Sequence, residues 1–217
     1  MFFNMASAMI KAVCFDLDGV FFAEQSFRRF KFQLAKYTDH GDVIDEVFHG
    51  SMMVAFKTNR ITEEIYWKYV RQRLEITLAN EEIFKMLRES YLVNVDVESY
   101  VRKIRAAGYM TCLCSNNFIT RIRELEKEFG FLKYFDTKIY SYDIGVLKPN
   151  IKIFQALVKQ CGIDASEIIY SDDSETKLSG AKELGIQTFL FKNIIQFKHI
   201  LSSLGVSTED GIISPSP

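Results

Sequence analysis

The chain has 217 residues, of which 48% are hydrophobic and 25% are charged. This composition excludes an intrinsically disordered protein and is typical of a globular chain, organised as one α/β domain with an insertion or as two small domains. The 27 basic and 28 acidic residues nearly cancel, so the chain has no general attraction for nucleic acid or for an anionic membrane.

The cysteines and the start of the chain bear on its compartment. The four cysteines are too few for a small disulfide scaffold and lack paired Cys-x-x-Cys zinc spacing. Three of them lie in predicted core strands, where buried, reduced thiols are expected. The first nine residues lack the basic segment and the long apolar run of a signal peptide. No stretch reaches the roughly 18 uninterrupted apolar residues of a membrane span. We therefore expect a soluble cytoplasmic protein.

The first predicted element is a strand from Lys11 to Phe15. Its nearly unbroken run of apolar β-formers is typical of a parallel strand that is covered on both faces. Asp16, Asp18 and Gly19 follow at its carboxyl end, where open α/β sheets bind their ligands. Taken alone, the same residues are equally compatible with a turn that closes the strand.

Residues 23–92 are predicted to form an all-helical insertion, which leaves residues 1–22 and 93–217 as an α/β core. Thr62 followed by two glutamates indicates a helix start, and no strand-like alternation of similar quality interrupts the segment. Trp67 is interpreted as a buried aromatic residue of this insertion rather than as a substrate contact. Three sets of residues recur at helical or partly helical spacing: Phe27, Phe30, Leu34 and Tyr37; Ile65, Tyr69, Arg73 and Ile76; Ile83, Met86, Leu87 and Ser90.

The rest of the chain alternates between helices and strands, which predicts a mostly parallel sheet with right-handed crossovers. Glycines end several of the helices, Asn150 can cap one, and the polar residues 207–217 are expected to fray. The predicted helices span residues 97–107, 119–129, 151–161, 175–184 and 194–204, and the predicted strands span residues 109–114, 137–141, 167–171 and 186–191.

Four segments, in this order, resemble the motifs of the haloacid dehalogenase (HAD) superfamily, whose members are mostly magnesium-dependent phosphohydrolases. They are Asp16-Leu-Asp-Gly-Val20, Thr111-Cys-Leu-Cys-Ser-Asn-Asn117, Gly145-Val-Leu-Lys-Pro-Asn150 and Ile168-Ile-Tyr-Ser-Asp-Asp-Ser174. The resemblance implies a Rossmann-like parallel sheet, with a helical cap inserted between the first two motifs that closes over the active site.

The resemblance also assigns roles to the first motif. Asp16 would be the nucleophile that forms an aspartyl-phosphate and would bind Mg²⁺. Asp18 would protonate the leaving oxygen, later help to activate water, and contribute its main-chain carbonyl to the metal site. A metal is needed because a carboxylate and each phosphate charge at about 4 Å repel by roughly 4 kcal/mol at an effective dielectric constant of about 20. Haloalkanoate dehalogenases of the superfamily lack the second Asp, so Asp18 favours oxygen leaving groups.

The second and third motifs would hold the phosphoryl group. By resemblance, Ser115 and adjacent main-chain amides, including that of Asn116, bind phosphoryl oxygens, while Lys148 neutralises the phosphoryl group and the nucleophile. Two alternatives stay open. The Ser115-Asn-Asn segment can cap the helix over residues 119–129, and a lysine is usually a solvated surface residue.

The fourth motif ends a predicted strand with two carboxylates. The resemblance gives Asp172 a direct or water-mediated contact with Mg²⁺, and gives Asp173 a role in orienting the water around the metal. Many relatives carry an Asn a few residues further on, whereas this chain has Glu175, Thr176 and Lys177. This departure leaves the surroundings of the metal site and the nearest subfamily open.

The leading hypothesis is a Mg²⁺-dependent phosphatase that acts on a small phosphorylated metabolite, such as a sugar phosphate. The alternatives are a phosphomutase resembling β-phosphoglucomutase and a non-catalytic binding or regulatory protein that retains the fold. A dehalogenase is disfavoured by Asp18. No nucleic-acid or membrane partner is expected, and the sequence does not give the substrate or the oligomeric state.

Overall fold

The computed structural model describes residues 9–208, which contain a five-stranded sheet. Its strands lie in the order β3-β2-β1-β4-β5, and every neighbouring pair is parallel, which confirms the predicted fold class. The central strand β1 therefore lies between the two strands that carry the second and fourth motifs. The strands are β1 (Ala12–Phe15), β2 (Met110–Ser115), β3 (Thr137–Tyr140), β4 (Ile168–Asp172) and β5 (Gln187–Leu190).

Helices cover both faces of this sheet. Alternation along β1 sends Val13 and Phe15 into an apolar cluster with α6 and α11, and sends Ala12 and Cys14 into a second cluster with α9 and α10. The strands are thus buried on both faces, which explains their nearly continuous apolar sequences. The helices after the insertion are α6 (Val95–Ala106), α7 (Ile119–Phe129), α8 (Ser141–Ile144), α9 (Ile151–Cys161), α10 (Ser179–Glu183) and α11 (Ile194–Ser203).

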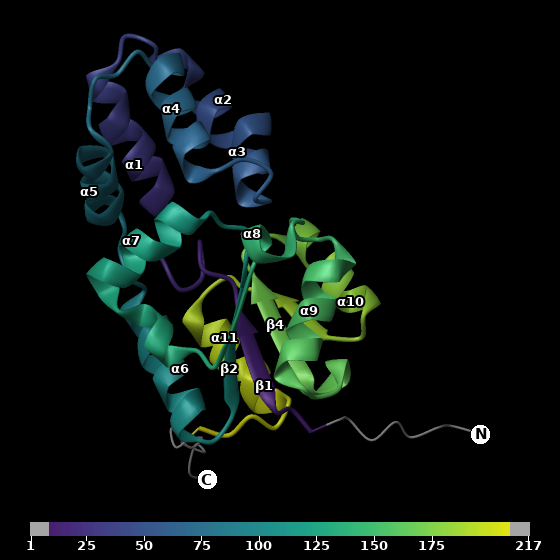
Figure 1. The fold of residues 1–217 in the computed structure, drawn as a ribbon. Helices are drawn as coiled ribbons and strands as arrows, with labels where there is room; N and C mark the ends of the chain where they lie inside the picture. The colour runs from purple at the N-terminus through teal and green to yellow at the C-terminus, as the bar shows by residue number, and fades with distance from the viewer. Residues whose placement is uncertain (1–8, 209–217) are drawn as a thin grey trace.

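Residues 26–90, all of which the structure describes, contain helices and no strand. Figure 1 shows these helices grouped beyond the carboxyl ends of the sheet strands. The chain leaves and returns along neighbouring segments, since Ala23 N donates to Leu92 O at 2.9 Å and Asn94 N donates to Phe21 O at 2.9 Å. The helices of this insertion are α1 (Ser26–Leu34), α2 (Ile44–His49), α3 (Ser51–Lys57), α4 (Glu63–Arg73) and α5 (Asn80–Ser90).

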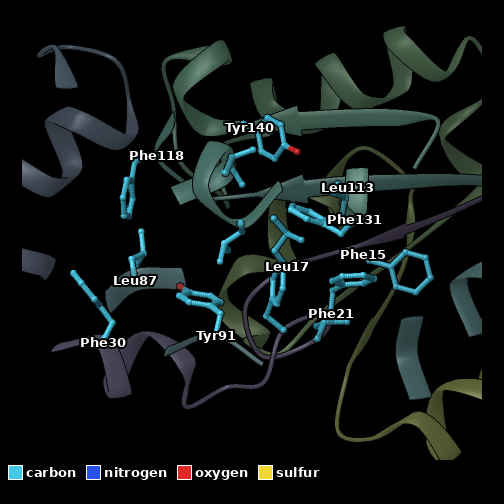
Figure 2. Close-up of a cluster of buried hydrophobic side chains, with 14 of the residues drawn as sticks. Phe15, Leu17, Phe21, Phe30, Leu87, Tyr91, Leu113, Phe118, Phe131 and Tyr140 are labelled. Atoms are coloured by element: carbon cyan, nitrogen blue, oxygen red, sulfur yellow. The ribbon is translucent and has the colours of Figure 1, made fainter. Parts of the chain in front are cut away.

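The insertion shares an apolar core with the sheet. Figure 2 shows Phe30 of α1 and Leu87 of α5 in the same buried cluster as Phe15 of β1 and Leu113 of β2. Polar contacts join the same parts: Trp67 Nε1 donates to Thr120 Oγ1 of α7 at 2.9 Å. Trp67 is fully buried, as interpreted from the sequence. The helical insertion is therefore packed firmly on the core.

Helix α4 shows one error of sequence-based prediction. Thr62 accepts a hydrogen bond from Ile65 N, so the predicted helix start is confirmed. However, the set at partly helical spacing that begins at Ile65 does not mark the buried face, because Ile65 is 49% exposed while Tyr66 and Trp67 are buried. The buried face is rotated by one to two residues because these two large aromatic side chains pack inside the insertion and against α7.

Three other expectations concern the whole chain. The three cysteines in core strands, Cys14, Cys112 and Cys114, are buried and free, as predicted, and Cys161 at the end of α9 is also buried and free. The signal-peptide assessment and the expected fraying fall mostly on residues 1–8 and 209–217, outside the described residues. Within residues 9–208, no helix combines the length and the apolar character needed to cross a membrane.

Candidate active site

Three carboxylates converge where β1 and β4 end. Asp16 directly follows β1, and Asp172 is the last residue of β4, so the parallel pairing places them side by side. Both are buried, with exposed fractions of 2% and 0%. Asp173 follows, and each of the three can offer one oxygen within 4.8 Å of the others. Such an all-oxygen set suits a hard divalent cation such as Mg²⁺.

Lys148 supplies the buried positive charge of the site. Its Nζ lies 3.0 Å from Asp16 Oδ1 and 2.7 Å from Asp172 Oδ2, and it donates to Cys114 O at 2.8 Å and to Tyr170 Oη at 2.7 Å. Burial alone would lower the pKa of Lys148, but the two carboxylates outweigh it and hold the pKa above the ordinary value. The surface-lysine alternative is therefore wrong for this residue.

The two buried aspartates differ in their electrostatics. Burial raises the pKa of Asp16, and the negative charge of Asp172 raises it further, against the opposing effect of Lys148. Burial would also raise the pKa of Asp172, but Lys148, Lys177 and two side-chain hydrogen bonds hold it below its ordinary value. Ionised Asp16 thus depends strongly on nearby cations.

The second motif lies next to this cluster. Ser115 ends β2 and is buried, and its hydroxyl accepts a hydrogen bond from Asn117 Nδ2 at 3.4 Å. Asn116 binds the backbone of Lys148: its Oδ1 accepts from Lys148 N at 2.7 Å and its Nδ2 donates to Lys148 O at 3.2 Å. Both ends of the Asn116 side-chain amide are therefore engaged by the protein itself. Helix α7 has no capping side-chain bond, so the capping interpretation is wrong.

Asp18 is held by an arginine that the sequence analysis missed. Arg121 Nη2 lies 2.7 Å from Asp18 Oδ2, while its other nitrogens donate to Tyr91 Oη at 2.9 Å and to Asn117 Oδ1 at 2.6 Å. Its side chain is only 2% exposed and lies over the ring of Phe118. The sequence contains only one signal for this role, the spacing of four residues from Asn117 to Arg121 within and beside the predicted helix over residues 119–129.

Lys177 was noted in the sequence as a departure, but its position was not foreseen. The predicted helix over residues 175–184 is divided into a 3-10 turn, Glu175–Lys177, and α10. The 3-10 turn is preceded by a tight turn in which Ser174 N donates to Asp172 Oδ1 at 3.0 Å. Lys177 Nζ then lies 3.5 Å from Asp16 Oδ2, and 3.3 Å from Oδ1 of both Asp172 and Asp173.

Gly19 allows the loop after β1 to approach these carboxylates. It has a φ of +76°, and a Cβ at this position would lie 2.2 Å from Asp173 Oδ2. A larger residue would therefore displace Asp173. Burial raises the pKa of Asp173 to about 6 despite the nearby Lys177.

One lysine reaches the site from the insertion. Lys57, the last residue of α3, is half-buried, and within the described part of the chain its ammonium has no hydrogen-bond or ion-pair partner. Burial lowers its pKa to about 8, and the charge of Arg121 contributes, while Asp18 has the opposite effect. Lys57 is therefore an unpaired cation near Asp18.

The predicted residues thus form one connected arrangement. Lys148 links Asp16 to Asp172, Asn116 fixes the backbone of Lys148, and Asp173 completes the carboxylate cluster. Asp18 follows Asp16 by two residues and turns toward Arg121. The cluster presents a buried carboxylate beside a permanent cation, together with oxygen ligands for a metal.

Comparisons with known proteins identify phosphatases among the proteins that this chain resembles. A D-ribitol-5-phosphate phosphatase of Bacteroides thetaiotaomicron is 29% identical over 119 residues, which cover 55% of this chain and 52% of the relative. YhcW of Bacillus subtilis, described as a candidate phosphatase, is 23% identical over 188 residues, which cover 85% of this chain and 84% of the relative.

A solved structure shares the fold. The HAD family enzyme bt-2542 of Bacteroides thetaiotaomicron, in complex with magnesium and inorganic phosphate, superimposes with a TM-score of 0.72 at 24% identity, covering 88% of this chain and 98% of that one. The family model of the haloacid dehalogenase-like hydrolases matches residues 10–185 of this chain. The match spans all four motifs and most of the sheet, and the chain belongs to the haloacid dehalogenase-like hydrolases.

Proposed function

We propose that this hydrolase is a Mg²⁺-dependent phosphatase that acts on a small phosphorylated metabolite through an aspartyl-phosphate on Asp16. The observation that supports this most directly is the buried contact of Asp16 with Lys148, beside Asp172 and Asp173. A buried carboxylate that must attack an anion requires positive charge at the reacting oxygen. Asp16, Asp172 and Asp173 would hold Mg²⁺, which would neutralise phosphate charge during the attack.

The residues divide the reaction into two displacements. Asp16 would attack phosphorus while the bond to the leaving oxygen breaks, and Asp18 would give its proton to that oxygen. Water would then attack the phosphorus of the aspartyl-phosphate, returning a proton to Asp18 and releasing inorganic phosphate from Asp16. The contact with Arg121 fixes the direction of the Asp18 side chain, and Lys148 faces the charge that develops beside Asp16.

The helical insertion would act as the cap that selects the leaving group. We assign residues 23–92 to this cap, and residues 1–22 and 93–217 to the catalytic core. The location of α1–α5 beyond the carboxyl ends of the strands supports this role (Figure 1). A sugar or polyol phosphate suits a cap that encloses a small polar group, in keeping with the name of the D-ribitol-5-phosphate phosphatase.

The direct test is hydrolysis of an activated aryl phosphate by the purified protein, with Mg²⁺ and with EDTA. Turnover that requires Mg²⁺ would support the proposal and justify a screen of sugar and polyol phosphates. Absence of turnover with every phosphate ester, in a folded protein that binds Mg²⁺, would contradict the phosphatase proposal and favour a mutase or a binding role.

Asp18→Asn is expected to slow hydrolysis most for substrates with poor leaving groups. An amide cannot protonate the leaving oxygen, and general acid catalysis typically contributes 10²–10⁴-fold. Rates would be compared for an aryl phosphate and for an alkyl phosphate, whose leaving group has a much higher pKa. If Asp18→Asn slowed both substrates equally, the acid role would be wrong. A thermal melt would show that loss of the Arg121 contact had not unfolded the variant.

Lys57, the unpaired cation of the insertion, would bind the phosphorylated substrate. Lys57→Met is therefore expected to raise KM by roughly tenfold or more, the effect of losing a hydrogen bond to a charged group. Its pKa of about 8 means that Lys57 is cationic below this pH and neutral above it. Wild-type kcat/KM should therefore fall as the pH rises through about 8, whereas Lys57→Met should lack this decline. Lys68→Met is the matched control, because Lys68 is exposed on α4. An unchanged KM in Lys57→Met would exclude a substrate contact.

A further inference from the structure

Lys177 places an ammonium group among the three carboxylates that suit a metal. Its Nζ lies 3.3–3.5 Å from one oxygen of each of Asp16, Asp172 and Asp173. No other residue in the described part of the chain makes ion pairs with all three, since Lys148 pairs only with Asp16 and Asp172. The centre therefore contains two lysines, of which only Lys177 lies at the convergence of the whole cluster.

The two lysines differ in their freedom to move. The side chain of Lys148 is fully buried and donates to a backbone carbonyl and to a tyrosine hydroxyl, so its position is fixed. The side chain of Lys177 is 30% exposed, projects from a 3-10 turn, and contacts the carboxylates only at 3.3–3.5 Å. A flexible four-carbon stem of this kind can leave the cluster toward solvent without opening the fold.

A metal and this ammonium compete for the same oxygens. Mg²⁺ binds oxygen ligands at about 2.0–2.1 Å, so an ion held by Asp16, Asp172 and Asp173 would lie in the space toward which Lys177 points. A metal ion and an ammonium group that contact the same carboxylates lie close together and repel each other strongly in a partly buried site. Occupation by one therefore disfavours the other.

We propose that Lys177 is a tethered counter-ion that competes with Mg²⁺ for Asp16, Asp172 and Asp173, so that metal binding requires its side chain to swing outward. The ammonium balances the carboxylates at low Mg²⁺ concentration and thereby raises the concentration at which the metal site fills. This inference rests on the proposed function only through the shared metal site. Its test measures Mg²⁺ binding without any substrate.

Titration calorimetry with Mg²⁺ alone tests this competition. Lys177→Met and Lys177→Asn should bind Mg²⁺ roughly tenfold or more tightly than wild type, because a like charge has been removed from beside the ion. Lys177→Arg, which retains the charge, should bind within a few-fold of wild type. Lys182→Met is the matched control, because Lys182 is also on this segment but pairs at 2.7 Å with Glu175, outside the cluster, and its affinity should be unchanged.

Thermal denaturation gives a second, independent result. Without Mg²⁺, Lys177→Met should melt at a lower temperature than wild type, since three neighbouring carboxylates lose a counter-ion. Saturating Mg²⁺ should raise its melting temperature more than that of wild type or Lys182→Met. Unchanged or weaker Mg²⁺ binding by both Lys177→Met and Lys177→Asn would overturn the proposal. Tighter Mg²⁺ binding by these variants, together with no turnover of any phosphate ester by the wild-type protein, would support the competition while refuting the proposed function.

Discussion

Asp16→Asn is expected to reduce turnover by roughly 10⁴-fold or more, the scale of loss seen when a covalent nucleophile is removed. The amide has almost the same shape as the carboxylate but lacks the charged oxygen needed for attack on phosphorus. Hydrolysis of an aryl phosphate with saturating Mg²⁺ measures this loss. Rapid quenching would also show whether phosphate is attached to the wild-type protein and absent from the variant.

The fold should survive this substitution. Asp16 is buried, and burial raises its pKa, so replacing it with a neutral amide removes a charge that is costly to bury. Lys148 keeps its contacts with Asp172, Tyr170 and the carbonyl of Cys114. A melting temperature close to that of wild type would show that lost activity reflects chemistry. Near-normal turnover in the folded variant would exclude the aspartyl-phosphate mechanism.

Much of the α/β core could be predicted because its signals are local. Helices α7 and α9 have the predicted bounds, since glycines end them, and Asn150 caps α9 by accepting a hydrogen bond from Lys152 N at 3.0 Å. The buried face of α4 could not be predicted in this way. The burial of Trp67 is expected from the sequence, but the burial of Tyr66 in place of Ile65 depends on contacts with Phe56 of α3 and Phe118 beside α7, which are distant in sequence.

The same distinction applies to the site. Asp16 and Asp172 belong to short motifs at the ends of two paired strands, so sheet topology brings them together. Lys148 lies in the loop before α9, and only its motif indicated that it belongs to the same site. Arg121 was missed because its partners Asp18 and Tyr91 come from distant segments.

Tyr170 gave a signal that went unused. It is a hydroxyl-bearing residue in an apolar strand, two positions before Asp172 and hence on the same face, and its hydroxyl donates to Asp172. A polar side chain on the buried face of a strand, on the same side as a carboxylate of the candidate site, points to a hydrogen bond within the site. Lys177 was visible in the sequence only as a difference from the usual fourth motif. Such a difference does not indicate which groups the ammonium of a flexible side chain contacts.

Lys148→Met should destabilise the protein by about 3–5 kcal/mol, the usual cost of removing one partner from a buried ion pair. Methionine fills a similar volume but leaves Asp16 and Asp172 as neighbouring buried carboxylates, and leaves the carbonyl of Cys114 without this donor. Urea unfolding at neutral pH measures the change in free energy of unfolding. Lys152→Met, at an exposed position on α9, is the control and should be nearly neutral.

The pH dependence of this difference identifies its cause. In wild type, Asp172 has a pKa below its ordinary value even though burial opposes this, largely because of Lys148. A carboxyl group with a lowered folded-state pKa stabilises the protein above its unfolded-state value of about 3.9, and this contribution is lost as the pH falls through the folded-state pKa. The stability advantage of wild type over Lys148→Met should therefore be complete near neutral pH and should shrink on acidification. An advantage that stayed constant down to the pH of acid unfolding would assign the loss to packing rather than to the charge of Lys148.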